Sequence, residues 1–299
     1  MDIMNWLGTL PGASAQGLIW GIMAIGVYIT FKILDLADLT VDGSMVTGMA
    51  TCAMLMTNGW NVWPAMFVAF LAGLAAGLLT GVFHTVFEIP AILSGILTQL
   101  ILWSVNLKIM GQANRALPAR SMAVLVTQLR KYEALVYLFL FCVVIIALLY
   151  WFFGTRYGMS IRATGCNEKM SRAQGINTNV NKVVGLALSN GIVALAGSLL
   201  AQYSGKADIS DGRGAIVIGL AAVIIGEAIV SKMGQGFVIR LTGVIVGGIV
   251  YYVVYQTVIF LGLDADLLKM LSALVVAVFL AVPNLKKKYF SKAKVKGAA

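Results

Sequence analysis

Long uncharged runs of apolar residues make up most of this chain, and short polar segments separate them. A helix needs about 20 apolar residues to cross the hydrocarbon core of a bilayer. Nine runs are candidates for such crossings, and the second and the last of them are short. They are Pro11–Phe31, Gly43–Asn58, Trp60–Phe87, Ile89–Leu107, Ala134–Phe153, Val183–Tyr203, Gly214–Ser231, Leu241–Leu263 and Met270–Pro283. The pattern predicts an all-α fold, a polytopic integral membrane helical bundle with about nine spans, in the range of about 8–10.

Glycines recur within these runs at a spacing of four residues, as at Gly73, Gly77 and Gly81 or at Gly243 and Gly247. This spacing places them on one face of a helix. Small residues on one face let neighbouring helices approach closely in lipid, so we expect these glycines to mark helix–helix contacts.

The composition agrees with a membrane protein and excludes most other classes. Hydrophobic residues make up 60% of the 299 positions and charged residues only 11%, which is too little charge for a soluble globular enzyme. No stretch has the character of a soluble domain. We expect one transmembrane domain over residues 1–285, containing a polar loop at 154–182, followed by a basic tail over residues 286–299.

The net charge of +10 is concentrated in two segments. The polar loop Gly154–Lys182 carries +4, and the tail carries +6 from lysines alone. Positive charge gathers on the cytoplasmic side of membrane proteins, so we expect both segments inside, with the C-terminus cytoplasmic and the N-terminus outside. The segment Lys108–Glu133 is also basic, although this topology places it outside. A nucleic-acid partner is not expected, because the charges are scarce and follow the topology.

The polar loop 154–182 contains a candidate short helix over Glu168–Gln174. Asn167 can cap its first amides, Glu168 suits its positive N-terminal end, and Gly175 suits its termination. A compact polar helix on the inner face suits a lever that docks into a groove on a cytosolic partner. The alternative is a solvated loop whose charge only follows the topology.

At this loop the sequence resembles a known family. The run YGMSIRATGCNEKMSRAQGINTNVNKV is similar to the cytoplasmic coupling segment of ABC-type permeases for branched-chain amino acids, ribose and related solutes. LADLTVDGSMVTGMATC at Leu36–Cys52 and GRGAIVIGLAAVIIGEAI at Gly212–Ile229 resemble two further motifs of that family, in the same order. The nearest group is that of uncharacterised permeases linked to tryptophan or tyrosine import. Two residues depart from the family pattern: Asp42 stands where the motif is usually neutral, and Glu227 replaces the usual second glycine.

The resemblance implies a function, a set of partners and a coupling site. It implies the permease subunit of an ATP-binding-cassette importer that moves a small organic solute, an amino acid first among them, inward by alternating access. The implied partners are cytosolic ATPase subunits, an external or periplasmic solute-binding protein, a second permease copy in a homodimer, and the lipid of a bacterial inner (plasma) membrane. The residues implied in coupling to the ATPase are Arg162, Gly165, Asn167, Glu168, Arg172 and Gly175.

Polar residues at the edges and within the runs are candidates for a substrate pathway. A short motif around Asp38 and Asp42 recurs in rough form around Asp208 and Asp211, as duplicated halves would leave it. These motifs can contact the substrate, or they can only start helices, because Asp, Thr and Ser before Gly are good helix N-caps. The two interpretations are compatible, since broken helices at membrane depth usually line a cavity. The candidate pathway residues are Asp38, Thr40, Asp42, Ser44, Gln99, Trp103 and Asn190.

Missing motifs narrow the choice further. There is no GxxxxGK[ST], HExxH or GxSxG pattern in the chain, so we expect no catalytic residues, no metal and no cofactor in this chain; ATP and Mg²⁺ would be bound by the partner subunit. Two other classes stay open: an ion-coupled secondary transporter of a small solute, favoured by the repeated Asp motif and Glu227, and a membrane scaffold with no transport of its own.

Overall fold

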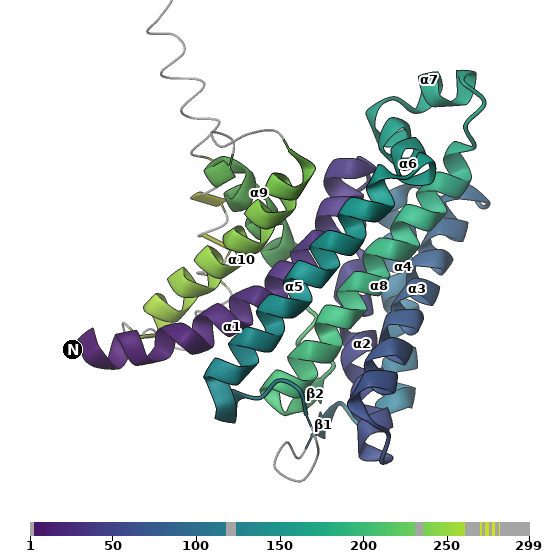
Figure 1. Cartoon of the computed structure of the whole chain (residues 1–299). Helices are drawn as coiled ribbons and strands as arrows, with labels where there is room; N and C mark the ends of the chain where they lie inside the picture. The colour runs from purple at the N-terminus through teal and green to yellow at the C-terminus, as the bar shows by residue number, and fades with distance from the viewer. Residues whose placement is uncertain are drawn as a thin grey trace, which may run out of the picture.

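A computed structural model describes residues 3–117, 124–230 and 236–260, together with residues 270, 273–274, 277–278 and 281. The described chain is almost entirely helical and carries one short pair of strands (Figure 1). Strands β1 and β2 pair antiparallel, with Asn114 opposite Asp208. The elements in chain order are α1 (Ile3–Tyr28), the π-helix η1 (Ile29–Ile33), α2 (Thr40–Thr57), α3 (Val62–Thr85), α4 (Ala91–Met110), β1 (Asn114–Ala116), the 3₁₀ turn η2 (Gln128–Arg130), α5 (Lys131–Gly154), α6 (Arg156–Cys166), α7 (Glu168–Ala173), α8 (Thr178–Ser204), β2 (Lys206–Asp208), α9 (Ala215–Val230) and α10 (Phe237–Phe260).

Within these residues, six helices are long and apolar enough to cross a membrane. They correspond to α1 with η1, α3, α4, α5, α8 and α10, so the all-α membrane bundle is confirmed while the count of nine spans is not. The run 43–58 forms α2, which is not among the six, and the run 214–231 forms α9, whose 16 residues cover only about 24 Å. Of the run 270–283 the structure describes only residues 270, 273–274, 277–278 and 281, and the tail 286–299 lies outside the described residues.

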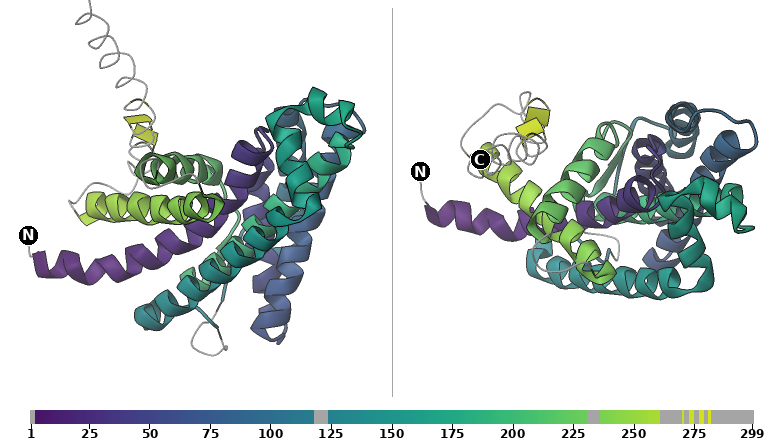
Figure 2. Two further views of the ribbon diagram at one scale, coloured as in Figure 1. Left: turned by 45° about the horizontal axis from the view of Figure 1, so that its top comes forward. Right: turned by 90° about the horizontal axis from the view of Figure 1, so that it is seen from above.

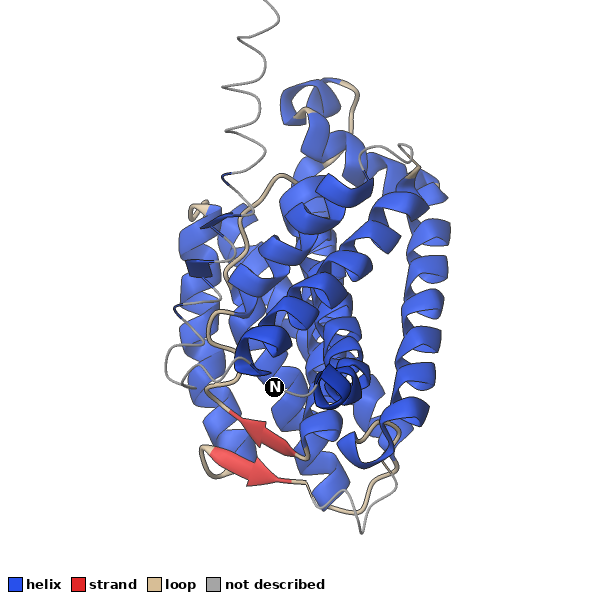
Figure 3. Ribbon diagram, turned by 90° about the vertical axis from the view of Figure 1, so that its left-hand side faces the viewer, coloured by secondary structure: helices blue, strands red, loops and turns tan. Residues whose placement is uncertain are grey.

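The bundle has two distinct ends. Helices α6 and α7 lie together at one end, and strands β1 and β2 lie at the other; the N-terminal end of α1 extends to one side, in the half nearer the strands (Figures 1 and 3). Helices α1, α9 and α10 pack on one another, while α2, α3 and α8 form a second group that α4 joins (Figure 2). Helices α1 and α8 are mostly buried and connect the two groups, whereas α4 and α5 are mostly exposed.

Close helix contacts occur where the glycine spacing predicts them. A Cβ atom on Gly73, Gly77 or Gly81 of α3 would overlap the backbone or side chains of α8. Gly247 of α10 lies in the same way against the backbone of α9, and Gly243 lies close to the Gly226 carbonyl and the Val230 side chain. These contacts need glycine because any larger side chain would push the helices apart.

Helices α2 and α9 are discontinuous elements that begin inside the bundle. Asp38, just before α2, hydrogen-bonds Asn190 near the middle of α8. Gly212, just before α9, lies against the backbone of Asp42 in the first turn of α2. The two helices therefore begin close together at mid-depth. From there α2 runs toward the β1–β2 end and α9 toward the α6–α7 end.

Candidate coupling site and polar pathway

The polar loop 154–182 folds into two short helices, α6 and α7. Asn167 accepts a hydrogen bond from the Met170 amide (3.0 Å) and so caps α7, as predicted. Gly175 ends this turn with a positive φ of 78°, a conformation that favours glycine. Helix α6, capped by the Thr155 hydroxyl, was not predicted from the sequence, because its apolar positions are few.

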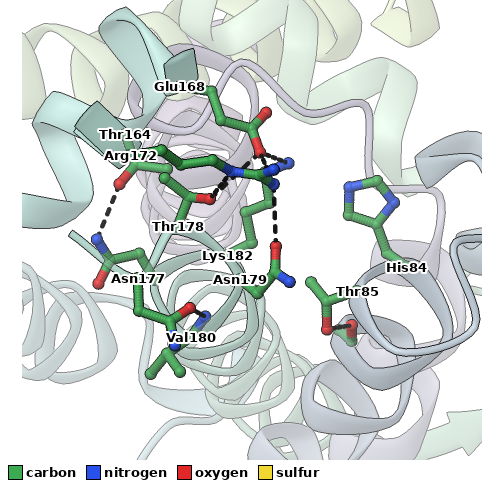
Figure 4. Close-up of polar contacts among 12 residues, drawn as sticks. His84, Thr85, Thr164, Glu168, Arg172, Asn177, Thr178, Asn179, Val180 and Lys182 are labelled. Carbon is green, nitrogen blue, oxygen red and sulfur yellow. Dashed lines mark hydrogen bonds and ion pairs between the residues drawn. The ribbon is translucent and has the colours of Figure 1, made fainter. Parts of the chain in front are cut away.

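Glu168 is the centre of a charged network that fixes α7 to the start of α8 (Figure 4). Its Oε1 atom accepts hydrogen bonds from Arg172 (2.7 Å), Lys182 (2.8 Å) and the Thr178 hydroxyl (3.3 Å). Arg172 also donates to Thr178 (2.8 Å) and to Asn179 (3.3 Å). We call these five residues the Glu168 cluster. The Lys182 hydrogen bond is the main cause that holds the pKa of Glu168 below its ordinary value of 4.5, with Arg172 and Thr178 adding to it.

Helix α6 attaches this end of the chain firmly to the bundle. A Cβ atom on Gly165 would overlap the carbonyl oxygen of Ile33, the last residue of η1. Asn181 of α8 donates to the hydroxyls of Ser160 (2.7 Å) and Thr164 (2.8 Å). Arg162 lies 5.3 Å above the ring of Phe237 at the start of α10. Helix α6 therefore contacts η1, α8 and α10 at once.

Helix α7, by contrast, projects from this end. Met170 on α7 is 62% exposed, and Lys169 beside it is exposed as well. An apolar side chain and a cation at the tip of a short, well-anchored helix form a surface that can press on a protein partner. The expected coupling residues fall into two sets. Glu168, Arg172, Asn167 and Gly175 build α7 and its anchor, while Arg162 and Gly165 fix α6 to the bundle.

Lys32 and Glu227 form an ion pair of 2.8 Å between η1 and α9. Each side chain is about one-third exposed, at 36% and 33%. The pair lies next to Ile33, against which Gly165 of α6 packs. A continuous set of contacts thus leads from α7 through α6 and η1 to the end of α9.

The first part of the predicted pathway is a buried polar cluster. Asp38 accepts hydrogen bonds from Asn190 Nδ2 (2.7 Å) and from the backbone amide of Thr40 (2.9 Å). Ser44 donates to Asn190 Oδ1 (2.6 Å), and the hydroxyls of Thr40 and Thr80 are 2.7 Å apart. These residues, here called the Asp38 cluster, join α2, α3 and α8 at mid-depth. Thr80 was not among the candidates, since a single Thr in an apolar run carries no distinguishing signal.

Asp42 has a different role from its neighbours. Its two carboxylate oxygens accept hydrogen bonds from the amides of Gly214 and Ile216, each at 2.9 Å. This carboxylate therefore caps the N-terminus of α9 from another helix, and it suits the positive end of that helix. The two Asp motifs thus meet in space, and each contains the same local turn, Asp38 to the Thr40 amide and Asp208 to the Ser210 amide, both 2.9 Å.

The two candidates on α4 lie apart from the Asp38 cluster. Gln99 is half-buried beside Gly43, and Trp103 lies under the guanidinium of Arg213, 4.6 Å from its ring centre. Asn106, one turn further, donates a long hydrogen bond of 3.4 Å to the Gly43 carbonyl, and its buried Oδ1 atom has no hydrogen-bond partner among the described residues. Arg213 lies within the motif at Gly212–Ile229 but was not among the candidates, because the resemblance assigns it no role.

These features define a class. A bundle of membrane-length helices, with two discontinuous helices that meet beside buried polar groups, and an anchored helical projection at one end, is the architecture of a polytopic membrane transport subunit. Residues 11–282 match the family described as "Branched-chain amino acid transport system / permease component". The chain belongs to this family, and it is a permease subunit of the ABC importer type.

Individual relatives agree with the family. The chain is 39% identical over 271 residues to the tyrosine transport system permease protein of Clostridioides difficile, covering 90% of both chains. It is 31% identical over 283 residues to an uncharacterised protein of Rickettsia prowazekii, covering 94% of this chain and 99% of that one. It is 28% identical over 215 residues to the autoinducer 2 import system permease protein LsrC of Escherichia coli, covering 69% of this chain and 59% of that one. No solved structure matches the chain significantly.

Proposed function

We propose that this permease subunit imports an amino acid, with an aromatic amino acid such as tyrosine as the first candidate, and that ATP hydrolysis in a separate cytosolic subunit drives it. The observation that carries the proposal is the anchored projection of α7, held by the Glu168 cluster and joined to the bundle by α6. The name of the tyrosine transport relative supports the substrate class. The chain itself then supplies no catalytic group.

The proposed topology places α6 and α7 in the cytoplasm of a bacterium and the β1–β2 end outside. The positive charge of the loop supports this orientation. The N-terminal end of α1 lies away from α7, in the half of the molecule nearer the strands, which agrees with an external N-terminus (Figure 3). At the outer end, the basic segment 108–133 would receive the solute-binding protein. A second copy would complete the pathway, since twofold homodimers are the commonest assembly.

The proposed mechanism is mechanical transmission along the contacts of α7. Closure of the ATPase subunits presses α7, and α6 carries that displacement to η1 through the contact of Gly165 with Ile33. The π-helix η1 is a deformable element, since such turns depart from the regular helix ladder. The Lys32–Glu227 pair then passes the movement to α9, whose other end is held by Asp42. Opening at that point would connect the Asp38 cluster with one side of the membrane.

One observation favours an ion-coupled secondary transporter as the alternative. Asp38 is a carboxyl group buried at mid-depth, with 3% of its surface exposed, and it accepts hydrogen bonds from two uncharged groups, the Asn190 side chain and the Thr40 amide. Buried carboxyl groups at this depth often bind a coupling proton or cation in transporters. The energy source of uptake separates the two functions.

Uptake by the reconstituted complex tests the proposal. The permease, its co-purifying ATPase subunit and its binding protein are placed in proteoliposomes, and uptake of radiolabelled L-tyrosine is measured with ATP or with an imposed ion gradient. We expect uptake with ATP alone, and none with a non-hydrolysable analogue. Uptake that follows the ion gradient and needs no ATPase would establish the secondary transporter instead.

A further inference from the structure

A cavity of about 510 Å³ lies between α1, α10, the first turn of α9 and the chain segment that leads into it. Because β2 forms part of its wall, the cavity belongs to the half of the bundle nearer the β1–β2 end. Its size is within the usual range of about 300–1,000 Å³ for small-molecule sites. Its walls combine aromatic rings with charged groups: Trp20, Tyr252, Tyr255, Lys206, Asp208 and Arg213. We call it the aromatic cavity.

One wall of the aromatic cavity is a cluster of aromatic rings. Trp20 and Tyr252 are stacked with ring centres 5.7 Å apart and an interplanar angle of 27°, and Tyr252 and Tyr255 are 5.6 Å apart with tilted planes. Trp20 and Tyr252 are held in place by burial, with 6% and 7% of their surface exposed. A fixed wall of this kind favours a flat aromatic ligand, because offset stacking adds to the area that the ligand buries.

The opposite wall carries charges that balance. Lys206 and Arg213 provide two cations, and Asp208 and Asp211 provide two anions. Lys206 lies 3.6 Å from Asp208 and 3.8 Å from Asp211, so both ion pairs are too long for direct hydrogen bonds. Such a wall matches a zwitterion, which brings one charge of each sign.

Arg213 is the group placed to meet a carboxylate. The amides at the start of α9 are already occupied by Asp42, so that helix end cannot bind a second anion. The Arg213 side chain is exposed and lies over the Trp103 ring, and no ion pair joins it to a carboxylate within the part of the chain that the structure describes. Arginine binds carboxylates through two parallel hydrogen bonds, which gives orientation as well as affinity.

We propose that the aromatic cavity is a binding site of the permease itself for an aromatic α-amino acid. The ligand carboxylate meets Arg213, its ammonium group meets Asp208, and its ring stacks against Trp20 and Tyr252. The proposal rests on the proposed function for its substrate class and goes beyond it in giving the permease its own selectivity, separate from that of the binding protein.

Direct binding without the solute-binding protein tests the site. The permease–ATPase complex in nanodiscs is titrated with tritiated L-tyrosine by scintillation proximity, with tyramine and L-leucine as competitors. We expect Arg213→Gln to weaken tyrosine binding by about tenfold or more, the loss of a charged hydrogen-bonding partner. It should also remove the preference for tyrosine over tyramine, which lacks the carboxylate. Arg156→Gln, the same change on an exposed arginine at the other end of the molecule, should bind tyrosine as the unmodified chain does.

Three further variants separate recognition from folding. Arg213→Lys keeps the charge without the paired hydrogen bonds, so we expect intermediate affinity. Tyr252→Phe should keep the preference for tyrosine over leucine, and Tyr252→Leu should lose it. Equal affinity of Arg213→Gln and Arg156→Gln, or an absence of saturable tyrosine binding, overturns this site even where the complete system imports tyrosine. A complete system that imports no amino acid with ATP overturns the proposed function instead, so the two failures are distinct.

Discussion

Single residues that break the family pattern have specific partners in the structure. Asp42 caps α9 with both carboxylate oxygens, and Glu227 pairs with Lys32 across two helices. An ionisable group within a membrane protein is costly unless it has polar partners; Glu227 has a cation, and Asp42 has two backbone amides. The two departures therefore stabilise the start and the end of the same discontinuous helix, which explains how the chain tolerates them.

Removal of the Asp42 cap should destabilise the bundle. Asp42→Ala leaves the amides of Gly214 and Ile216 without their acceptor, so we expect a loss of about 1–3 kcal/mol in the free energy of unfolding. Asp42→Asn keeps a capping oxygen and should lose less. The measurement is SDS titration of the purified permease in mixed micelles. A loss below about 0.5 kcal/mol for Asp42→Ala would show that the cap is dispensable.

The close contact of Gly165 with the Ile33 carbonyl can also be tested by a single substitution. Gly165→Ala forces α6 away from the Ile33 carbonyl, and we expect ATP-driven uptake to fall strongly while ATP hydrolysis by the partner continues. Gly154→Ala is the matched control, since a Cβ atom there meets nothing within 4 Å. Equal uptake by the two variants would remove Gly165 from the transmission of force.

At the scale of elements, the patterns of apolar residues predicted where helices form, but they did not predict which helices are too short to cross the membrane. The runs that became α3, α4, α5, α8 and α10 were long enough for their length alone to predict a crossing. The runs that became α2 and α9 looked like further spans, because a run's composition does not show that its helix begins at mid-depth. That start depends on Asp42 capping a helix 172 positions away in the chain, a contact that no local pattern contains.

Part of the candidate site could be predicted from local sequence rules, and the rest depends on tertiary contacts. Asn167, Glu168 and Gly175 could be assigned from local capping rules, and α7 forms where they predicted it. The contacts of Glu168 with Lys182 and of Asp38 with Asn190 depend on tertiary packing. Glu227 stood out in the sequence only as a departure from the family pattern, and its partner Lys32 lies in another helix, which no local pattern shows.

The Glu168 cluster predicts a pH dependence of α7. A carboxyl group whose pKa is lowered by folding stabilises the folded state above its unfolded pKa, and this contribution is lost as the pH falls through the lowered value. We therefore expect protection of residues 168–182 to stay constant from about pH 8 to about pH 5 and to decrease below about pH 4. Hydrogen exchange, corrected for intrinsic rates, measures it. Glu168→Gln should show lower protection and little change with pH, and an identical profile for both chains would contradict the account.

At the scale of the whole molecule, two groups of helices are joined through the buried helices α1 and α8. The group α1, α9 and α10 contains the aromatic cavity and the Lys32–Glu227 pair, and α6 touches both groups through η1, α8 and α10. A displacement at α7 can therefore move one group against the other. Discontinuous helices that meet at mid-depth are well placed to open and close a pathway in such a movement.

The measurement that tests the central claim most directly is a cross-link between α7 and the ATPase subunit. Met170→Cys, made in a Cys166→Ser chain so that this exposed native thiol is absent, places a thiol at the tip of α7. Asn61→Cys at the opposite end is the control. The account predicts that a thiol-to-amine cross-linker joins position 170, and not position 61, to the co-purifying ATPase, with a yield that changes when ATP binds. Equal labelling at both positions, or no cross-link at 170 in a complex that still transports, would contradict it.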